Sequence, residues 1–135
     1  MLNGFPLLTI LIFLPLTGAL CLVPFWSRPG SARRVALAMA LLELVLAGGL
    51  FPVITRAAHS PGTPLFLFRE DHSWIAGIGA RYTLGMDGIS YLLVLLTAFI
   101  TVVAMLVSWQ SIGERIALHY LLLLVMESGI MGVFL

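Results

Sequence analysis

The sequence predicts an all-α integral membrane protein in which four helices cross the bilayer. Hydrophobic residues make up 61% of the 135 residues, charged residues make up only 10%, and the mean hydropathy is +1.11. A soluble domain of this size could not keep so apolar a surface in contact with water. The apolar residues also gather into four runs of about 20 residues, the length that a helix needs to cross a hydrocarbon core.

The first predicted span covers residues 5–25 and contains no charged residue. A secretory signal opens with a basic region, which residues 1–20 lack, so the segment is expected to be retained. Residues 27–34 combine proline and glycine with three arginines, which is typical of a short loop at the membrane surface. Arginines concentrate in cytoplasmic loops, so this connector is expected to be cytoplasmic and the N-terminus non-cytoplasmic. The second span is predicted over residues 35–54.

The segment between residues 55 and 87 has a different character from the spans around it. It contains most of the charged residues outside the arginine-rich connector, and apolar and polar residues alternate around Phe66 and Phe68. Gly77 and Gly79 then supply a turn. This pattern predicts a polar loop or a short β-hairpin on the membrane surface between the second and third helices.

The third span is predicted over residues 88–109, with Asp87 as the side chain that caps its first backbone N–H groups. A polar turn at residues 110–115 leads into the fourth span, residues 116–135. The sequence is still apolar at Leu135, without a helix stop or a polar flank. We therefore expect a single membrane domain that is the start of a larger bundle.

Several functional classes are excluded by composition. The chain has seven arginines, no lysine and no basic run, so nucleic acid is not an expected partner. Cys21 is the only cysteine, and no haem, iron-sulfur or phosphate-binding motif is present. The sequence therefore predicts no catalytic centre, cofactor site or metal site in this chain, and a lipid bilayer around it.

Glu43 is the first candidate functional residue. It lies nine residues after Arg34, about 13 Å along a helix, which places it near the middle of the bilayer. Ala36, Ala40 and Ala47 share its helical face, so it is expected to point into the bundle. An acid at this depth indicates a proton path. A hydrogen-bonded packing residue is the alternative, and the sequence does not separate the two.

Glu127 and His119 are the other proton-path candidates. Glu127 lies in the fourth span with Ser128, Gly129 and Gly132 as small neighbours. His119 is eight residues earlier, about 12 Å along the helix, so the two could relay a proton only through water or other helices. Packing remains the alternative role for Glu127.

Two further polar groups are predicted to be structural. One is a stripe on the third span that is expected to bond within or between helices: Ser90, Thr97, Thr101 and Ser108. The other is the charged run at residues 69–72, together with Arg81, for which surface ion pairing and helix capping are expected.

Several short motifs occur along the chain in a fixed order: Phe13-Leu14-Pro15-Leu16, Trp74-Ile75, Tyr82 to Ser90 (YTLGMDGIS), Leu95-Leu96-Thr97, Ser108-Trp109 and Gly129 to Leu135 (GIMGVFL). Together they resemble the antiporter-like subunits of the proton-pumping NADH:quinone oxidoreductase, complex I, and among these the M or chain 4 type. The signature Asp87-Gly88-Ile89-Ser90 is shared more widely, including with multisubunit sodium/proton antiporters.

The resemblance implies a subunit of about 14 helices that translocates protons, of which this chain supplies four. It also implies partner subunits in the membrane arm, and flavin, iron-sulfur clusters and quinone in other subunits. The principal glutamate of the family lies in a fifth helix, so its role is not transferred to Glu127. A sodium/proton antiporter subunit and a small four-helix scaffold remain as alternatives.

Overall fold

The computed structural model describes residues 6–58 and 68–135. In chain order these residues form α1 (Leu7–Leu22), a short 3-10 helix η1 (Val23–Phe25), α2 (Pro29–Gly49), α3 (Phe51–Ala58), β1 (Phe68–Ile75), a second 3-10 turn η2 (Ala76–Ile78), β2 (Ala80–Met86), α4 (Gly88–Ser111) and α5 (Ile116–Phe134). Residues 65–67, which belong to the alternating segment of the sequence, lie outside the described residues.

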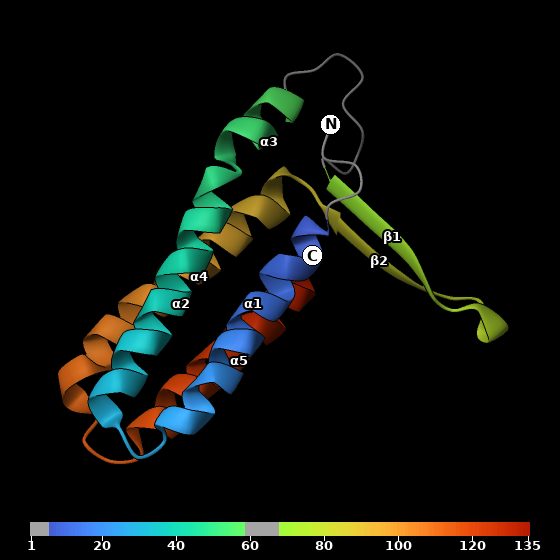
Figure 1. The fold of residues 1–135 in the computed structure, drawn as a ribbon. Coiled ribbons are helices and arrows are strands. Elements are labelled where there is room, and N and C mark those ends of the chain that lie inside the picture. Colours follow the sequence, from blue (N-terminus) through green and yellow to red (C-terminus); the bar gives the residue numbers. More distant parts are fainter. Residues whose placement is uncertain (1–5, 59–67) are drawn as a thin grey trace.

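Four helical segments of the described chain are long and apolar enough to cross a bilayer, which confirms the predicted fold class. They are Leu7–Phe25, Pro29–Arg56, Gly88–Ser111 and Ile116–Phe134. In the bundle, α1 packs against α5 and α2, and α4 packs against α2 and α5. Helices α2 and α5 also touch across the centre. The start of α1 and the end of α5 lie at the same end of the bundle, next to the β-hairpin (Figure 1).

The second helix begins earlier than the sequence pattern indicated. It starts at Pro29, where proline at the first helical position loses no hydrogen bond and already has a helical φ. The prediction that residues 27–34 form a loop is therefore wrong for most of that segment, since Arg33 and Arg34 lie on α2. One guanidinium nitrogen of Arg33 donates to the carbonyl of Ile112 at 2.7 Å, which ties α2 to the turn before α5.

The predicted β-hairpin is present and projects sideways from the bundle (Figure 1). Strands β1 and β2 pair antiparallel, from Phe68 opposite Met86 to Ile75 opposite Ala80, with a bulge near the tip. Gly79 has φ of +68°, a conformation that glycine adopts without the strain other residues meet. On β2, Leu84 and Met86 are buried in the same apolar cluster as the start of α1.

Glu70 of β1 fastens the hairpin to the bundle. Its carboxylate accepts hydrogen bonds from the backbone N–H groups of Leu8 and Thr9, at 2.6 and 3.1 Å, and from the Thr9 hydroxyl at 2.6 Å. These N–H groups belong to the first turn of α1, where a helix has no acceptor of its own. No side chain at the N-cap position itself, Pro6, fulfils this role.

Small residues and hydroxyl groups hold the four helices together. The inward face of α2 is Ala32, Ala36, Ala40, Glu43 and Ala47, all with no exposed surface. Alanines allow close approach of neighbouring helices, and buried hydroxyls then bond across the contacts. The Tyr91 hydroxyl on α4 donates to Ala47 O on α2 at 3.1 Å. On α5, the Tyr120 hydroxyl donates to Met105 O of α4 at 3.1 Å. The Ser128 hydroxyl, also on α5, donates to Ile12 O of α1 at 2.6 Å.

Candidate functional site

The interior of the bundle contains a small polar layer. Among the described residues, the buried polar side chains are Glu43, Thr101, Glu127 and Ser128, and neither glutamate has any exposed surface. They come from three helices: α2 supplies Glu43, α4 supplies Thr101, and α5 supplies the other two. The prediction that Glu43 points into the bundle is confirmed.

These residues lie at similar depth in the bundle. Glu43 is 14 residues from the start of its span and 13 from the end, about 20 Å from either. Thr101 is 13 residues from the start of α4 and 10 from its end, about 20 and 15 Å. Glu127 is 11 residues, about 16 Å, from the start of α5. Glu43, Thr101 and Glu127 therefore lie at least about 10 Å from either end of their helical segments.

Glu43 and Glu127 are the central members of this layer. Neither oxygen of either carboxyl group has a hydrogen-bond partner. Both lie on the buried faces of their helices, and α2 and α5 meet across the centre of the bundle. Unpartnered buried carboxyl groups are rare, since burying a polar group without a hydrogen bond costs several kcal/mol.

The two hydroxyl groups of the layer already donate their protons elsewhere. Thr101 Oγ1 donates to Thr97 O at 3.0 Å, and Ser128 Oγ donates to the carbonyl of Ile12 on α1 at 2.6 Å. Thr101 lies beside Glu127, and its oxygen still has lone pairs free. A protonated Glu127 could therefore donate a hydrogen bond to Thr101, and the Thr101 hydroxyl could donate to an ionised Glu127 if it turned away from Thr97 O.

His119 lies apart from the polar layer. It is in the first turn of α5, where its ring meets that of Tyr120 edge-on, with 5.4 Å between the ring centres. Its Nε2 atom is buried without a hydrogen-bond partner. The structure thus brings Glu127 to Glu43 rather than to His119, and the predicted relay between His119 and Glu127 has no direct contact.

The charged residues outside the membrane serve the local structure. Asp71 on β1 pairs with Arg81 at 2.9 Å and with Arg69 at 3.4 Å, and the Arg81 hydrogen bonds lower the pKa of Asp71. Asp87 is the N-cap of α4, where it accepts from the Ser90 N–H at 2.6 Å, and this bond lowers its pKa. No group of three metal-binding side chains occurs in residues 6–58 and 68–135.

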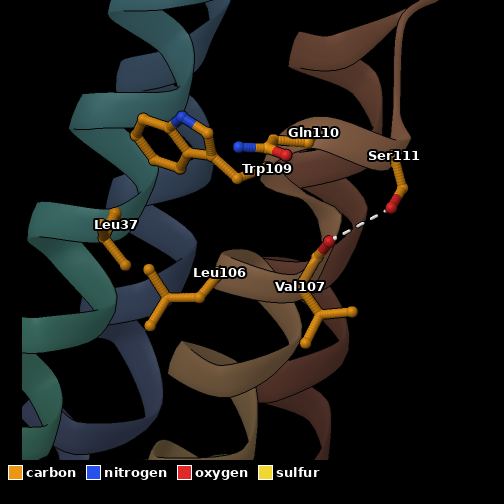
Figure 2. A pocket seen from close by; sticks show the side chains of 6 residues that line it. All are labelled: Leu37, Leu106, Val107, Trp109, Gln110 and Ser111. Atoms are coloured by element: carbon orange, nitrogen blue, oxygen red, sulfur yellow. Dashed lines mark hydrogen bonds between the residues drawn. The ribbon is translucent and has the colours of Figure 1, made fainter.

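An open groove on the outside of the bundle lies away from the polar layer. It runs between α2 and α4 near the arginine-rich end and is lined by Leu37, Leu106, Val107, Trp109, Gln110 and Ser111 (Figure 2). The Ser111 hydroxyl donates to Val107 O at 3.3 Å, so it is already satisfied within its own helix (Figure 2). None of these side chains is ionisable, so the groove adds no acid or base to the candidate site.

Comparison with known proteins agrees with the motifs. The chain is 38% identical to NAD(P)H-quinone oxidoreductase chain 4 of Mesostigma viride chloroplasts and 34% identical to that of Physcomitrium patens, each over 134 residues and 98% of this chain. It is 37% identical over 136 residues to chain 4 1 of Thermosynechococcus vestitus. This chain is homologous to NAD(P)H-quinone oxidoreductase chain 4. No family model matches it.

The homology to chain 4 covers only part of the relatives. The chain spans about a quarter of the length of the curated relatives it matches, 25% and 26% in the two chloroplast proteins. The four helices therefore correspond to one portion of a larger helical bundle in chain 4 proteins. Within that portion, the polar layer is where the fully buried carboxyl groups of the described residues lie.

Sequence reasoning identified both glutamates of this layer but did not pair them. Glu43 was identified from its predicted depth in the bilayer and from the alanines that share its helical face. Glu127 was identified from the small residues next to it in the sequence. Thr101 was assigned to a stripe of packing residues, and its position beside Glu127 gave no signal in the sequence. The diagonal contact between α2 and α5, which brings the two acids together, depends on how the helices are ordered in space.

Proposed function

We propose that this chain belongs to a membrane-arm subunit of a proton-translocating NAD(P)H:quinone oxidoreductase. The observation that carries the proposal is the match to chain 4 proteins along 98% of the chain. Four apolar helices agree with a place in the membrane. In such a complex, electron transfer from the nicotinamide to quinone drives the transport of protons across the bilayer.

The contribution of this chain would be to proton transfer, with no redox chemistry of its own. Flavin, iron-sulfur clusters and quinone are expected in partner subunits, since no cofactor-binding motif is found in the sequence. A buried acid deep within a helical bundle is a common element of proton paths through membranes. Glu43 and Glu127 are therefore the residues of this chain that we assign to proton handling.

The distribution of arginines supports one orientation. The end of the bundle that holds η1 and the turn before α5 carries four arginines, Arg28, Arg33, Arg34 and Arg115, against one acid, Glu114. The hairpin end has as many acids as arginines among its described residues. Basic residues favour the cytoplasmic side. We therefore place the arginine-rich end in the cytoplasm and the N-terminus on the opposite side.

Purification of the native complex from gently solubilised membranes tests this function. The expected result is that this chain copurifies with flavin-containing and iron-sulfur subunits and that the preparation reduces quinone with a nicotinamide donor. In sealed vesicles the same reaction should acidify one side. Isolation with sodium/proton antiporter subunits alone, or as a lone four-helix protein, would contradict the proposal.

A further inference from the structure

We propose that Glu43 and Glu127 act as one coupled site that takes up and releases a single proton. This inference rests on the proposed function and deepens it, because it states how two residues of this chain would hold the transported proton. The observation behind it is that two carboxyl groups, on the buried faces of two helices that contact each other, are fully buried and without hydrogen-bond partners.

The surroundings of the pair supply no counter-charge. No arginine or lysine occurs within residues 7–25, 35–55, 88–111 or 116–134, and these ranges contain no other acid. Helix α1 presents the Ile12 carbonyl, which Ser128 already occupies, and α4 presents Thr101. Two ionised carboxylates would thus stand near each other in a medium of low polarity with nothing to balance them, which is strongly unfavourable.

In these surroundings, each carboxyl group is able to form a hydrogen bond with the other. When one carboxyl gives up its proton, the remaining protonated carboxyl is able to donate a hydrogen bond to the new charge. A rotation of either flexible side chain, or one bridging water, would be enough to make that bond. The pair would therefore alternate between a neutral form with two protons and a form with one proton and a shared negative charge.

Coupling of this kind distinguishes the pair from two separate acids. Where two groups interact strongly, protons leave in steps that belong to the pair and not to either residue. Removing one carboxyl should then change the titration of the other. Apart from the tyrosines and Cys21, His119 is the only other ionisable side chain in these spans, and it is about 12 Å from Glu127 along α5.

Infrared difference spectroscopy of the native complex tests the coupling. Protonated carboxyl groups give a C=O stretching band that shifts in heavy water, and the band is assigned by comparing wild type with Glu43→Gln and Glu127→Gln. In each single variant we expect the titration midpoint of the remaining carboxyl to move by at least about one pH unit. A movement of less than one unit overturns the proposal, as does a midpoint that depends on sodium concentration.

Proton pumping supplies a second readout with its own control. Each single glutamine variant should lower the number of protons pumped per electron while quinone reduction persists, and the double variant should lower it no further. Glu114→Gln removes an exposed glutamate that has no ion pair with another described residue, and it should change neither pumping nor the band. Additive losses in the double variant would overturn the coupling.

Two precautions keep the outcomes separate. If a glutamine variant fails to assemble, aspartate at the same position retains a carboxyl group that is one methylene shorter, and the midpoint of its partner should still move. If the native complex proves to lack oxidoreductase subunits, the proposed function fails, but the carboxyl band still reports on the pair. Unchanged bands and pumping in a working oxidoreductase would overturn the pair alone.

Discussion

Replacing Glu70 should release the hairpin from the start of α1. The Glu70 carboxylate accepts three hydrogen bonds, from Leu8 N, Thr9 N and Thr9 Oγ1, and two of these satisfy N–H groups that have no acceptor within the helix. A hydrogen bond contributes about 1 kcal/mol net, so Glu70→Ala should weaken this junction by about 3 kcal/mol. Because each 1.4 kcal/mol changes an equilibrium constant about tenfold, the equilibrium constant for opening this junction should be about 100 times larger.

Hydrogen exchange of the intact complex measures that opening directly. The Leu8 and Thr9 amides should exchange about 100 times faster in Glu70→Ala than in the wild type. Asp71→Ala is the matched control, because Asp71 is the next residue on the strand but bonds to Arg81 instead of α1. Equal exchange of Leu8 and Thr9 in wild type and Glu70→Ala would refute the reasoning, as would an equal acceleration in the control.

Three other substitutions test separate features of the fold. Gly79→Ala should destabilise the hairpin tip by about 1 kcal/mol because φ is +68°, whereas Gly77→Ala should not, and exchange of the strand amides compares them. Gly18→Ala places a methyl group 3.1 Å from Met39, so it should cost about 1–3 kcal/mol in thermal unfolding of the solubilised protein. The pKa of Asp87 is lowered below 3.8 in the fold, so its cap should stabilise the protein fully above that pH and lose its effect under stronger acid. Unfolding of Asp87→Asn, which keeps an acceptor, should lack this pH dependence.

Some features of the molecule follow from local sequence and were predictable. The spans could be identified because the bilayer demands about 20 apolar residues from each helix. Glu43 could be assigned to the interior because Ala36, Ala40 and Ala47 recur on the same face, and all have no exposed surface. The hairpin could be expected because glycines at 77 and 79 interrupt an alternating segment.

Other features depend on contacts between distant segments and gave no local signal. Arginines suggested a loop at residues 27–34, yet long basic side chains can extend to the membrane surface from a helix that has already begun at Pro29. The bond between Glu70 and Leu8 joins residues 62 positions apart. The pairing of Glu43 with Glu127 was not predictable for the same reason. The spacing of residues along one helix does not show which neighbouring helix its buried face contacts.

The alanine face of α2 links the packing of the bundle to its candidate chemistry. Larger side chains at Ala40 or Ala47 would hold α2 away from its neighbours, and the centre would then admit lipid or water between the two acids. Alanines instead leave Glu43 as the only long side chain on that buried face. The carboxyl group therefore occupies the space where α2 and α5 cross, and the close packing that stabilises the bundle is also what excludes other partners from the pair. A proton held there would be exchanged only when the helices or the side chains move, which is the property that a transport site requires.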